Sequence, residues 1–249
     1  DDILAIMNYC ENNLIRFYSV PHVRNYIKRQ LQLELLGEVP VLSIRTEPLQ
    51  NPVNRLAKRL FDLTFSSLFL LTIFPFMYLI VGLIIKITSP GPIFFKQERN
   101  GENGKIFKCY KFRSMKVNAL SDSLQATKND PRKTKFGNFL RKSNLDELPQ
   151  FINVFKGEMS IVGPRPHMLK HTEEYSQLIN KYMMRHLVKP GITGWAQVTG
   201  YRGETKELSQ MEGRVRRDLW YIENWTFLLD IRIMIKTVTN MFRGEKNAY

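Results

Sequence analysis

The sequence has 249 residues, which is enough for one or two domains with a buried core. Its 37 Lys and Arg against 23 Asp and Glu give a net charge of +14, which indicates an anionic partner: phosphorylated substrates, an anionic membrane face or nucleic acid. Nucleic acid is disfavoured because the chain lacks zinc-ligand spacing and a basic–aromatic repeat. The two cysteines form no CxxC motif, so a disulfide framework is excluded and a reducing compartment is expected.

The first 50 residues predict the order helix, strand, helix, strand, over 2–13, 14–20, 23–35 and 39–44. This order is typical of the tail of a parallel-sheet α/β domain. Residues 47–54 hold two prolines and no periodicity, and they are predicted to form a linker. Because the chain begins with Asp1 rather than Met, we expect a fragment of a longer protein.

The longest apolar stretch covers residues 63–85, without a single charge and with Pro75 near its centre. One continuous helix of this length would measure about 34 Å, enough to cross the ~30 Å core of a bilayer. Pro75 removes a backbone N–H and clashes with the preceding turn, so we expect it to kink or break the helix.

Basic residues flank both ends of this stretch: Arg55, Lys58 and Arg59 before it, and Lys86, Lys96, Arg99 and Lys105 after it. The positive-inside rule expects such an excess on the cytoplasmic side only. The sequence therefore favours a re-entrant helix–break–helix that enters and leaves by one face. A kinked transmembrane helix is the alternative, because prolines are tolerated in such helices.

The region after the apolar stretch is predicted to mix strands, helices and loops. In chain order we expect a turn at 88–92, a β-hairpin over 93–115 with its turn at 100–104, and a mobile loop over 116–135. A helical run is expected to start over 136–142, followed by a segment over 143–157 with Ser143 and Asn144 as candidate helix caps. A short apolar piece over 159–166, a helix over 173–187 and an ordered loop over 190–203 are expected next.

Residues 205–243 are predicted to be helical and rich in aromatic residues. Trp220, Tyr221, Trp225, Phe227 and Leu228 lie among Arg216, Arg217, Arg232 and Lys236. This mixture is typical of a helix that lies in the membrane interface, and an ordinary core helix fits the pattern equally well.

Two adjacent acids, Asp146 and Glu147, are the first candidates for chemistry. If a helix begins near residues 143–145, its free amides and positive dipole end would lower the pKa of both carboxylates and keep them ionised. An ionised carboxylate can attack phosphorus or hold a divalent metal. The alternative is that the two acids only complement the helix dipole.

A set of basic residues in or beside Gly/Pro turns forms the second candidate: Lys108, Lys111, Arg113, Arg132, Arg141, Lys142, Arg165 and Arg202. Arginine in a rigid turn is suited to bidentate phosphate binding, although most such charges are solvated surface. The sequence has no GxxxxGK[ST] loop, and its histidines lack HExxH spacing, so neither a P-loop nor a zinc site is expected. His167 and His171 are interpreted as a surface pair.

Five segments carry a resemblance: KRLFD (58–62), TSPGPIFFKQERNG (88–101), YKFRSM (110–115), LRKSNLDELPQFINVFKGEMSIVGPRP (140–166) and VKPGITGWAQVTGYRGET (188–205). On their order and spacing, the chain from about Arg55 to Tyr249 resembles the bacterial sugar transferase family, the monotopic phosphoglycosyl transferases. The N-terminal piece resembles the end of the Rossmann-like domain of the large members of this family. The resemblance implies transfer of a sugar-1-phosphate from a UDP-sugar to undecaprenyl phosphate, with release of UMP.

The resemblance also implies roles for individual residues. Asp146 matches the family nucleophile, and Glu147 matches its acidic partner, so the pair is expected to act in catalysis and with Mg²⁺. Arg141 is expected to bind the polyprenyl phosphate, and Arg165 the nucleotide-sugar. Substrate contacts are also expected from Lys111, Arg113 and Arg202.

Pro75 matches the proline that breaks the family's re-entrant helix. Many members have Ser before this proline, whereas this chain has Phe74. The help that the serine gives to the freed backbone groups is therefore missing here.

The sequence as a whole predicts an α+β protein. We expect the tail of an α/β Rossmann-like domain and a linker over 1–50, followed by a transferase domain over 51–249. Within the transferase domain we expect a membrane-inserted re-entrant helix over 63–85, a cytosolic catalytic region of helices and a β-hairpin over 93–205, and interfacial helices over 205–243. The expected location is the cytoplasmic face of the bacterial inner membrane. The expected sugar is a hexose, with glucose preferred, and a homo-oligomer is compatible with the sequence. The competing hypothesis is a non-catalytic scaffold that binds anionic lipid.

Overall fold

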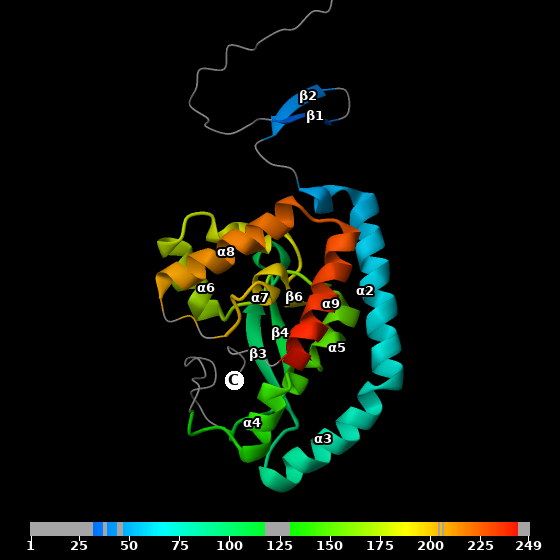
Figure 1. The fold of residues 1–249 in the computed structure, drawn as a ribbon, viewed down its shortest axis with the longest axis vertical. Coiled ribbons are helices and arrows are strands. Elements are labelled where there is room, and N and C mark those ends of the chain that lie inside the picture. The colour runs from blue at the N-terminus through cyan, green and yellow to red at the C-terminus, as the bar shows by residue number, and fades with distance from the viewer. Residues whose placement is uncertain are drawn as a thin grey trace, which may run out of the picture. The chain divides into compact units, whose positions relative to one another are not determined.

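The computed structural model describes two strands over 32–36 and 39–43, and then residues 47–117, 130–203, 205 and 207–243 (Figure 1). The chain divides into two units, Asp1–Arg45 and Thr46–Tyr249. In the first unit, β1 (Gln32–Leu36) pairs antiparallel with β2 (Val39–Ser43).

The strand predicted over 39–44 is confirmed by β2, but the helix predicted over 23–35 is wrong from Gln32 onward. Only two residues separate β1 from β2, and Leu36 lies opposite Val39. So short a connection permits an antiparallel hairpin and excludes a parallel crossover between these two strands. The predicted elements over 2–13 and 14–20 lie outside the described residues, and the Rossmann-like tail stays a prediction.

The second unit begins with a helix pair that is bent at a proline. Helix α2 (Pro52–Thr72) follows the short 3-10 helix η1 (Pro48–Gln50) and begins where the Asn51 side chain accepts a hydrogen bond from the Val53 amide at 2.9 Å. Helix α3 (Phe74–Thr88) carries Pro75 in its first turn, and the two helices are bent by 56°. The expected break is therefore confirmed, because proline has no N–H to continue the hydrogen bonding of α2.

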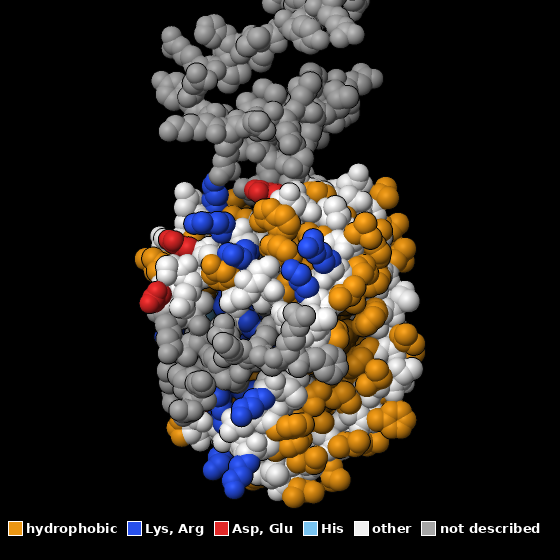
Figure 2. Space-filling view, viewed as in Figure 1, with side chains coloured by type: hydrophobic (Ala, Val, Ile, Leu, Met, Phe, Trp, Pro, Cys, Tyr) orange, Lys and Arg blue, Asp and Glu red, His pale blue; other side chains and the backbone are white. Residues whose placement is uncertain are grey.

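Among the described residues, no single helix is long and apolar enough to cross a membrane. The bent pair α2–α3 meets the criterion of length and composition only when the two helices are taken together. Figure 2 shows apolar side chains gathered along the α2 and α3 side of the second unit. The large exposed ones are Val53, Leu56, Leu60, Phe65, Leu68, Leu71, Ile73, Phe76, Tyr78, Leu79, Ile80, Leu83 and Ile87.

The predicted β-hairpin is confirmed. Strands β3 (Phe94–Asn100) and β4 (Ile106–Phe112) pair antiparallel, with Phe94 opposite Phe112 and Asn100 opposite Ile106. The 3-10 helix η2 (Glu102–Gly104) makes the turn. The predicted loop over 116–135 is described only at its ends, where the Lys116 amide donates to the Arg132 carbonyl.

The remaining elements surround this hairpin (Figure 1). In chain order they are α4 (Lys135–Lys142), η3 (Leu145–Glu147), α5 (Gln150–Lys156), β5 (Ser160–Val162), α6 (Leu169–Leu178), η4 (Tyr182–Leu187), β6 (Gly191–Thr193), α7 (Trp195–Val198), α8 (Leu208–Glu223) and α9 (Phe227–Arg243). Strands β5 and β6 pair in parallel, and α5 packs against α2. The fold is thus mixed helix and strand, as the α+β prediction requires.

Two predicted segments differ in detail. The helix predicted over 173–187 is interrupted between α6 and η4, where Lys181 adopts a left-handed conformation with φ of 65°. The loop predicted over 190–203 contains β6 and α7, which are too short to show a period in the sequence.

The aromatic residues of the C-terminal helices divide between the core and the surface. Tyr221 and Trp225 are buried in the main hydrophobic core with Phe107, Val154 and Ile233. The Lys58 ammonium from α2 lies 2.5 Å from the buried Asp230 carboxylate, which also accepts from the Tyr221 hydroxyl and the Trp225 indole. Trp220, Phe227 and Leu228 are exposed. The core interpretation therefore holds for two of the five apolar residues, and an interfacial role stays a prediction for the others.

Candidate active site

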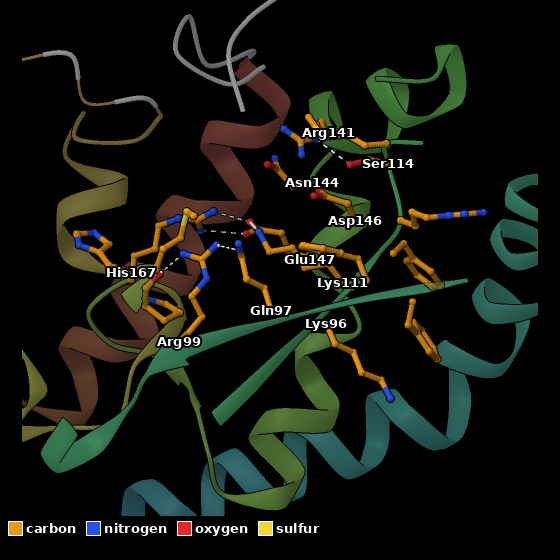
Figure 3. Close-up of a pocket in the computed structure, with 18 of the residues that line it drawn as sticks. Lys96, Gln97, Arg99, Lys111, Ser114, Arg141, Asn144, Asp146, Glu147 and His167 are labelled. Carbon is orange, nitrogen blue, oxygen red and sulfur yellow. Dashed lines mark hydrogen bonds and ion pairs between the residues drawn. The ribbon is translucent and has the colours of Figure 1, made fainter. Parts of the chain in front are cut away.

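A cavity of about 580 Å³ lies beside the β3–β4 hairpin, and its lining also includes residues of α4, η3, α6 and α8 and of the segments around Arg165 and Arg202. Six of the eight predicted basic residues line it, namely Lys111, Arg113, Arg132, Arg141, Arg165 and Arg202. Lys108 and Lys142 are exposed and do not line it. Both predicted acids, Asp146 and Glu147, also line the cavity (Figure 3).

The two acids lie on η3, a single 3-10 turn, rather than at the start of an α-helix. The preceding Asn144 is in the left-handed region with φ of 58° and makes no capping hydrogen bond, and Ser143 bonds back to α4. The predicted caps and dipole are therefore absent from this part of the described chain. What distinguishes Asp146 and Glu147 is burial, because each is only 7% exposed.

Glu147 is held by two cations. The Lys111 ammonium lies 2.7 Å from Oε1. The Arg165 guanidinium donates to Oε1 at 2.5 Å and to Oε2 at 3.1 Å. Burial alone would raise the pKa of Glu147, but the charges of Arg165 and Lys111 outweigh it and hold the pKa well below its ordinary value. Glu147 is thus a fixed negative charge.

The pKa of Asp146 is shifted in the opposite direction to that of Glu147. The Asp146 carboxylate makes no hydrogen bond or ion pair to any residue in the described ranges. Burial, together with the charge of Glu147 and against the nearby Lys111 and Arg141, raises the pKa of Asp146 to about 6. The prediction that both pKa values are lowered is therefore wrong for Asp146, since the desolvation of its carboxylate exceeds the attraction of the cations.

Two arginines are anchored close to Asp146. The Arg141 Nε donates to the Ser114 hydroxyl at 2.8 Å, and Arg202 donates to the Asn144 side-chain oxygen. Figure 3 shows Arg141, Asn144 and Asp146 on one side of the cavity, with Glu147 and Lys111 at its centre. The Arg141 guanidinium is thus positioned by a neutral partner, which leaves its positive charge available for an anionic ligand.

Arg113 and Arg132 have partners of another kind. The Arg113 guanidinium donates to the carbonyls of Ser89 and Pro90 at 2.5 and 2.7 Å, just after α3. Gly91 has a φ of 125°, and a Cβ there would lie 2.3 Å from Arg113 Nη1, so only glycine allows this approach. Arg132 pairs with Asp130 at 2.6 Å. Both side chains hold backbone or loop structure at the edge of the cavity, and their contact with a substrate stays a prediction.

Sequence reasoning missed a buried polar layer at the back of the cavity, in which His167 and Arg214 line the cavity and are backed by Tyr182, Arg185 and Asp218. His167 is buried rather than on the surface, and its Nδ1 lies 2.6 Å from the Tyr182 hydroxyl. The interpretation of His167 and His171 as a surface pair is therefore wrong for His167, while His171 is half-buried, and both line the cavity. The available signal was the position of His167 two residues after Arg165 in a Gly-Pro-Arg-Pro turn.

Comparison with known proteins decides the family. The sequence profile described as "Bacterial sugar transferase" matches residues 53–244. The chain belongs to the bacterial sugar transferase family. The match covers the helix pair from Val53 onward, the cavity and both C-terminal helices, so the resemblance inferred from the sequence motifs is confirmed.

Individual members of the bacterial sugar transferase family are closely similar to this chain. A UDP-glucose:undecaprenyl-phosphate glucose-1-phosphate transferase from Escherichia coli K12 is 52% identical over 92% of this chain and 49% of its own length. A protein of the same name from Xanthomonas campestris is 45% identical over 100% of this chain and 52% of its own length. A UDP-N-acetylgalactosamine-undecaprenyl-phosphate N-acetylgalactosaminephosphotransferase from Aeromonas hydrophila is 35% identical over 91% of this chain and 54% of its own length. The chain therefore spans about half the length of these relatives.

The cavity of this bacterial sugar transferase combines two chemical features, positive charge and a buried carboxylate. Arginines and a lysine provide positive charge for phosphate groups. A buried carboxylate, Asp146, has no partner among the described residues and a pKa close to neutrality. Such a group is largely ionised above pH 6 and is weakly solvated, which suits it to nucleophilic attack on phosphorus.

Proposed function

We propose that this chain carries the site that transfers glucose-1-phosphate from UDP-glucose to undecaprenyl phosphate with release of UMP. The two relatives at 52% and 45% identity are named for this reaction. The relative named for an N-acetylgalactosamine donor is less similar, at 35% identity. This order of similarity favours glucose over an N-acetylated sugar.

The observation that carries the proposal is the contrast between the two acids. Glu147 is committed to Lys111 and Arg165, whereas Asp146 is buried beside it with a free carboxylate. A structural acid would be paired, because burying an unpaired carboxylate costs stability. The contrast thus supports a chemical role for Asp146.

The proposed reaction has two steps. An Asp146 carboxylate oxygen attacks the β-phosphorus of UDP-glucose, and the bond from this phosphorus to the bridging oxygen breaks, so that UMP leaves with the electron pair. The phosphate oxygen of undecaprenyl phosphate then attacks the same phosphorus and displaces Asp146, which regenerates the carboxylate. This sequence predicts ping-pong kinetics.

The cations of the cavity bind and orient the phosphates in this proposal. Arg165 holds Glu147 and faces the nucleotide-sugar, while Lys111 lies within reach of both acids. Arg141 and Arg202, which are anchored by Ser114 and Asn144, would bind the phosphate of the lipid acceptor and the leaving group. Such fixed charges stabilise the negative charge that spreads over the transferring phosphoryl group.

A magnesium ion fits this site if the substrate phosphates and water supply part of its ligands. No group of three or more His, Cys, Asp or Glu capable of holding a metal occurs in the described ranges. Mg²⁺ is commonly bound by one or two carboxylates together with water and substrate phosphates, and the free carboxylate of Asp146 with its neighbour Glu147 meets that need. We propose that these two residues hold Mg²⁺ with the diphosphate, where the ion would neutralise phosphate charge.

The helix pair is proposed to enter the membrane and return by the same face. Arg55 near the start of α2 lies 3.3 Å from Glu102, which follows α3 in the chain. Arg113, which directly follows β4, donates to the carbonyls of Ser89 and Pro90, which directly follow α3. Both ends of the pair therefore contact one folded body, which supports a re-entrant over a transmembrane arrangement. The active site would lie at the cytoplasmic face of the inner membrane, where UDP-glucose and the lipid acceptor meet.

The test is a donor panel. The purified chain in detergent or nanodiscs is given undecaprenyl phosphate, Mg²⁺ and either UDP-glucose, UDP-galactose, UDP-N-acetylglucosamine or UDP-N-acetylgalactosamine, and released UMP is measured. We expect the highest kcat/KM with UDP-glucose and no UMP from Asp146→Asn. Vesicle binding without UMP from any donor would instead support a lipid-binding scaffold and overturn the proposal.

A further inference from the structure

The buried layer behind the cavity contains an ion pair that contacts no cavity acid. Arg185 on η4 and Asp218 on α8 have side chains that are 1% and 2% exposed, and Arg185 Nη2 lies 2.6 Å from Asp218 Oδ2. A pair that is fully removed from water is retained at a cost in desolvation, so its other contacts indicate what it does.

Besides a 3.4 Å contact with the Tyr182 hydroxyl, those contacts lead to the turn that carries Arg165. The same Nη2 of Arg185 donates to the Arg165 carbonyl at 2.9 Å. The other terminal nitrogen, Nη1, lies 2.5 Å from His167 Nδ1. Because a guanidinium has only donors, the Nδ1 of His167 must accept, and the imidazole is neutral. One guanidinium thus binds the backbone of Arg165 and the side chain two residues later.

We propose that Arg185, held in place by Asp218, is a positioning residue that fixes the backbone of Arg165 and so sets the Arg165–Glu147 pair. This inference rests on the proposed function, because it assigns to Arg185 an effect on the transferase reaction through Arg165.

The turn needs such a support because little else fixes its centre. At its start, the Gly163 amide donates to the Thr193 carbonyl and Pro164 accepts from the Gly191 amide. At its centre, the two carbonyls of Arg165 and Pro166 accept only from guanidinium groups, those of Arg185 and Arg99, among the hydrogen bonds of the described residues. Prolines on both sides of Arg165 supply no amide donor.

A lysine cannot replace Arg185 in this geometry. The planar guanidinium donates to Asp218, the Arg165 carbonyl and His167 from two separate nitrogens, whereas all the N–H groups of an ammonium lie on one nitrogen. Arg185→Lys therefore keeps the charge that Asp218 needs and removes the fixed fork. A small displacement of Arg165 relative to Glu147 is then expected to lower the rate strongly, because misplacement of about 1 Å can cost ~100-fold.

The deciding experiment is a double-mutant cycle with kcat/KM for UDP-glucose, measured as UMP release. Arg185→Lys is made in the wild-type protein and in Arg165→Ala. We expect a loss of about tenfold or more in the wild-type background and less than about twofold where Arg165 is already absent, since the effect passes through that side chain. An equal loss in both backgrounds would overturn the positioning role.

A matched control separates this role from loss of stability. Lys58→Met breaks another buried pair, that between Lys58 and Asp230, which lies away from the cavity lining. Hydrogen–deuterium exchange of residues 163–168 needs no activity and serves as the second readout. We expect faster exchange there in Arg185→Lys and Asp218→Asn but not in Lys58→Met. Unchanged exchange in both Arg185→Lys and Asp218→Asn would contradict the inference.

The failure of the proposed function would be visible separately. If the wild-type protein releases no UMP from any donor, the transferase proposal fails before variants are compared, and the exchange measurement alone decides whether Arg185 fixes the turn. If the wild type is active and the cycle is additive, only the positioning role is lost.

Discussion

The guanidinium of Arg165 spans both carboxylate oxygens of Glu147, at 2.5 and 3.1 Å. This contact keeps Glu147 ionised, and the charge of Glu147 in turn helps burial to raise the pKa of its neighbour Asp146 to about 6. The two acids therefore have different tasks, since one is a fixed charge and the other changes its protonation near neutral pH.

The pH dependence of the reaction follows from this difference. Asp146 attacks only as a carboxylate, so kcat/KM for UDP-glucose is expected to rise with pH through about 6 and then level off. Glu147→Gln removes a negative charge beside Asp146 and frees Arg165 and Lys111, and both changes lower the pKa of Asp146. The acidic rise in the pH profile of the residual kcat/KM should therefore move to lower pH in this variant. A rise at the same or a higher pH would contradict its assignment to Asp146.

Removal of the Asp146 charge is expected to stabilise the fold while it abolishes activity. A carboxylate whose pKa is raised by folding favours the folded state when protonated, and this stability is lost as pH rises from 3.8 through about 6. The rise in pKa corresponds to about 3 kcal/mol. Asp146→Asn should therefore increase the free energy of unfolding at pH 8 by up to that amount, measured by denaturant titration.

The control for this stability measurement is Asp130, a buried carboxylate that is paired with Arg132 at 2.6 Å. Asp130→Asn removes a satisfied charge and is expected to lower stability, in the opposite direction to Asp146→Asn. If both variants lost stability, Asp146 would be a structural acid rather than an uncompensated one.

Gly137 in α4 is expected to be irreplaceable because α4 contacts the β4 end of the cavity there. A Cβ at this position would lie 1.8 Å from the Ser114 carbonyl oxygen, and the Ser114 hydroxyl anchors Arg141. Gly137→Ala should cost roughly 1–3 kcal/mol through overpacking and also lower activity through Arg141. Thermal unfolding and UMP release check the two effects.

Gly82 in α3 gives the comparison for Gly137. A Cβ there meets the end of the flexible Ile93 side chain at 3.1 Å, with no backbone atom in the way. Gly82→Ala is expected to leave activity unchanged and to gain up to about 1 kcal/mol of helix propensity. Similar losses in the two glycine variants would contradict the claim that the Ser114 contact is the cause.

The sequence predicted the elements that local patterns determine. The alternation along β3 and β4, the break at Pro75 and the two acids in LDELPQ all follow from local sequence patterns. The helix predicted over 23–35 is wrong from Gln32 onward. Leucine is a good helix former, but pairing with β2 overrides this propensity there. The short β6 and α7 carried too few residues for any period to appear.

The electrostatics of the site could not be predicted from the sequence because they depend on long-range packing. A dipole at a helix start was expected to lower the pKa of Asp146, but η3 is one turn long and burial dominates. Arg185 and Asp218 are separated by 33 residues and carry no motif, so only the fold brings them together. The roles of Arg141, Arg165, Arg202 and the metal remain predictions, although the cavity gathers the residues concerned.

Asn144 has two tasks that a pair of variants can separate. Its left-handed backbone leads into Asp146, and its side chain accepts from Arg202. Asn144→Gly keeps the backbone conformation without strain and removes the anchor, so stability should be retained while kcat/KM falls. Asn144→Ala adds backbone strain of about 1–3 kcal/mol, so it should lose stability as well. Equal activity in wild type and Asn144→Gly would show that Arg202 needs no anchor.

The contact between Arg55 and Glu102 leads to a topology prediction. Cysteines are placed at Val53 in α2 and Ile106 in β4, which are both exposed and lie before and after the apolar helix segment in the chain, in a Cys10→Ser background. A membrane-impermeant maleimide should label both cysteines from the cytoplasmic side in inverted membrane vesicles and neither cysteine in intact cells. Leu71→Cys, on the exposed apolar face next to the bend, should be protected by lipid. Labelling of positions 53 and 106 from opposite sides would establish a transmembrane helix instead.

The central claim is that Asp146 forms a covalent bond to the transferred phosphoryl group. The most direct measurement is intact-protein mass spectrometry after incubation with UDP-glucose and Mg²⁺ in the absence of undecaprenyl phosphate, followed by fragmentation to locate the adduct. We predict one hexose phosphate on Asp146, release of an equal amount of UMP, and loss of the adduct when undecaprenyl phosphate is added. Steady formation of the lipid product without any adduct, or an adduct on another residue, would contradict the account.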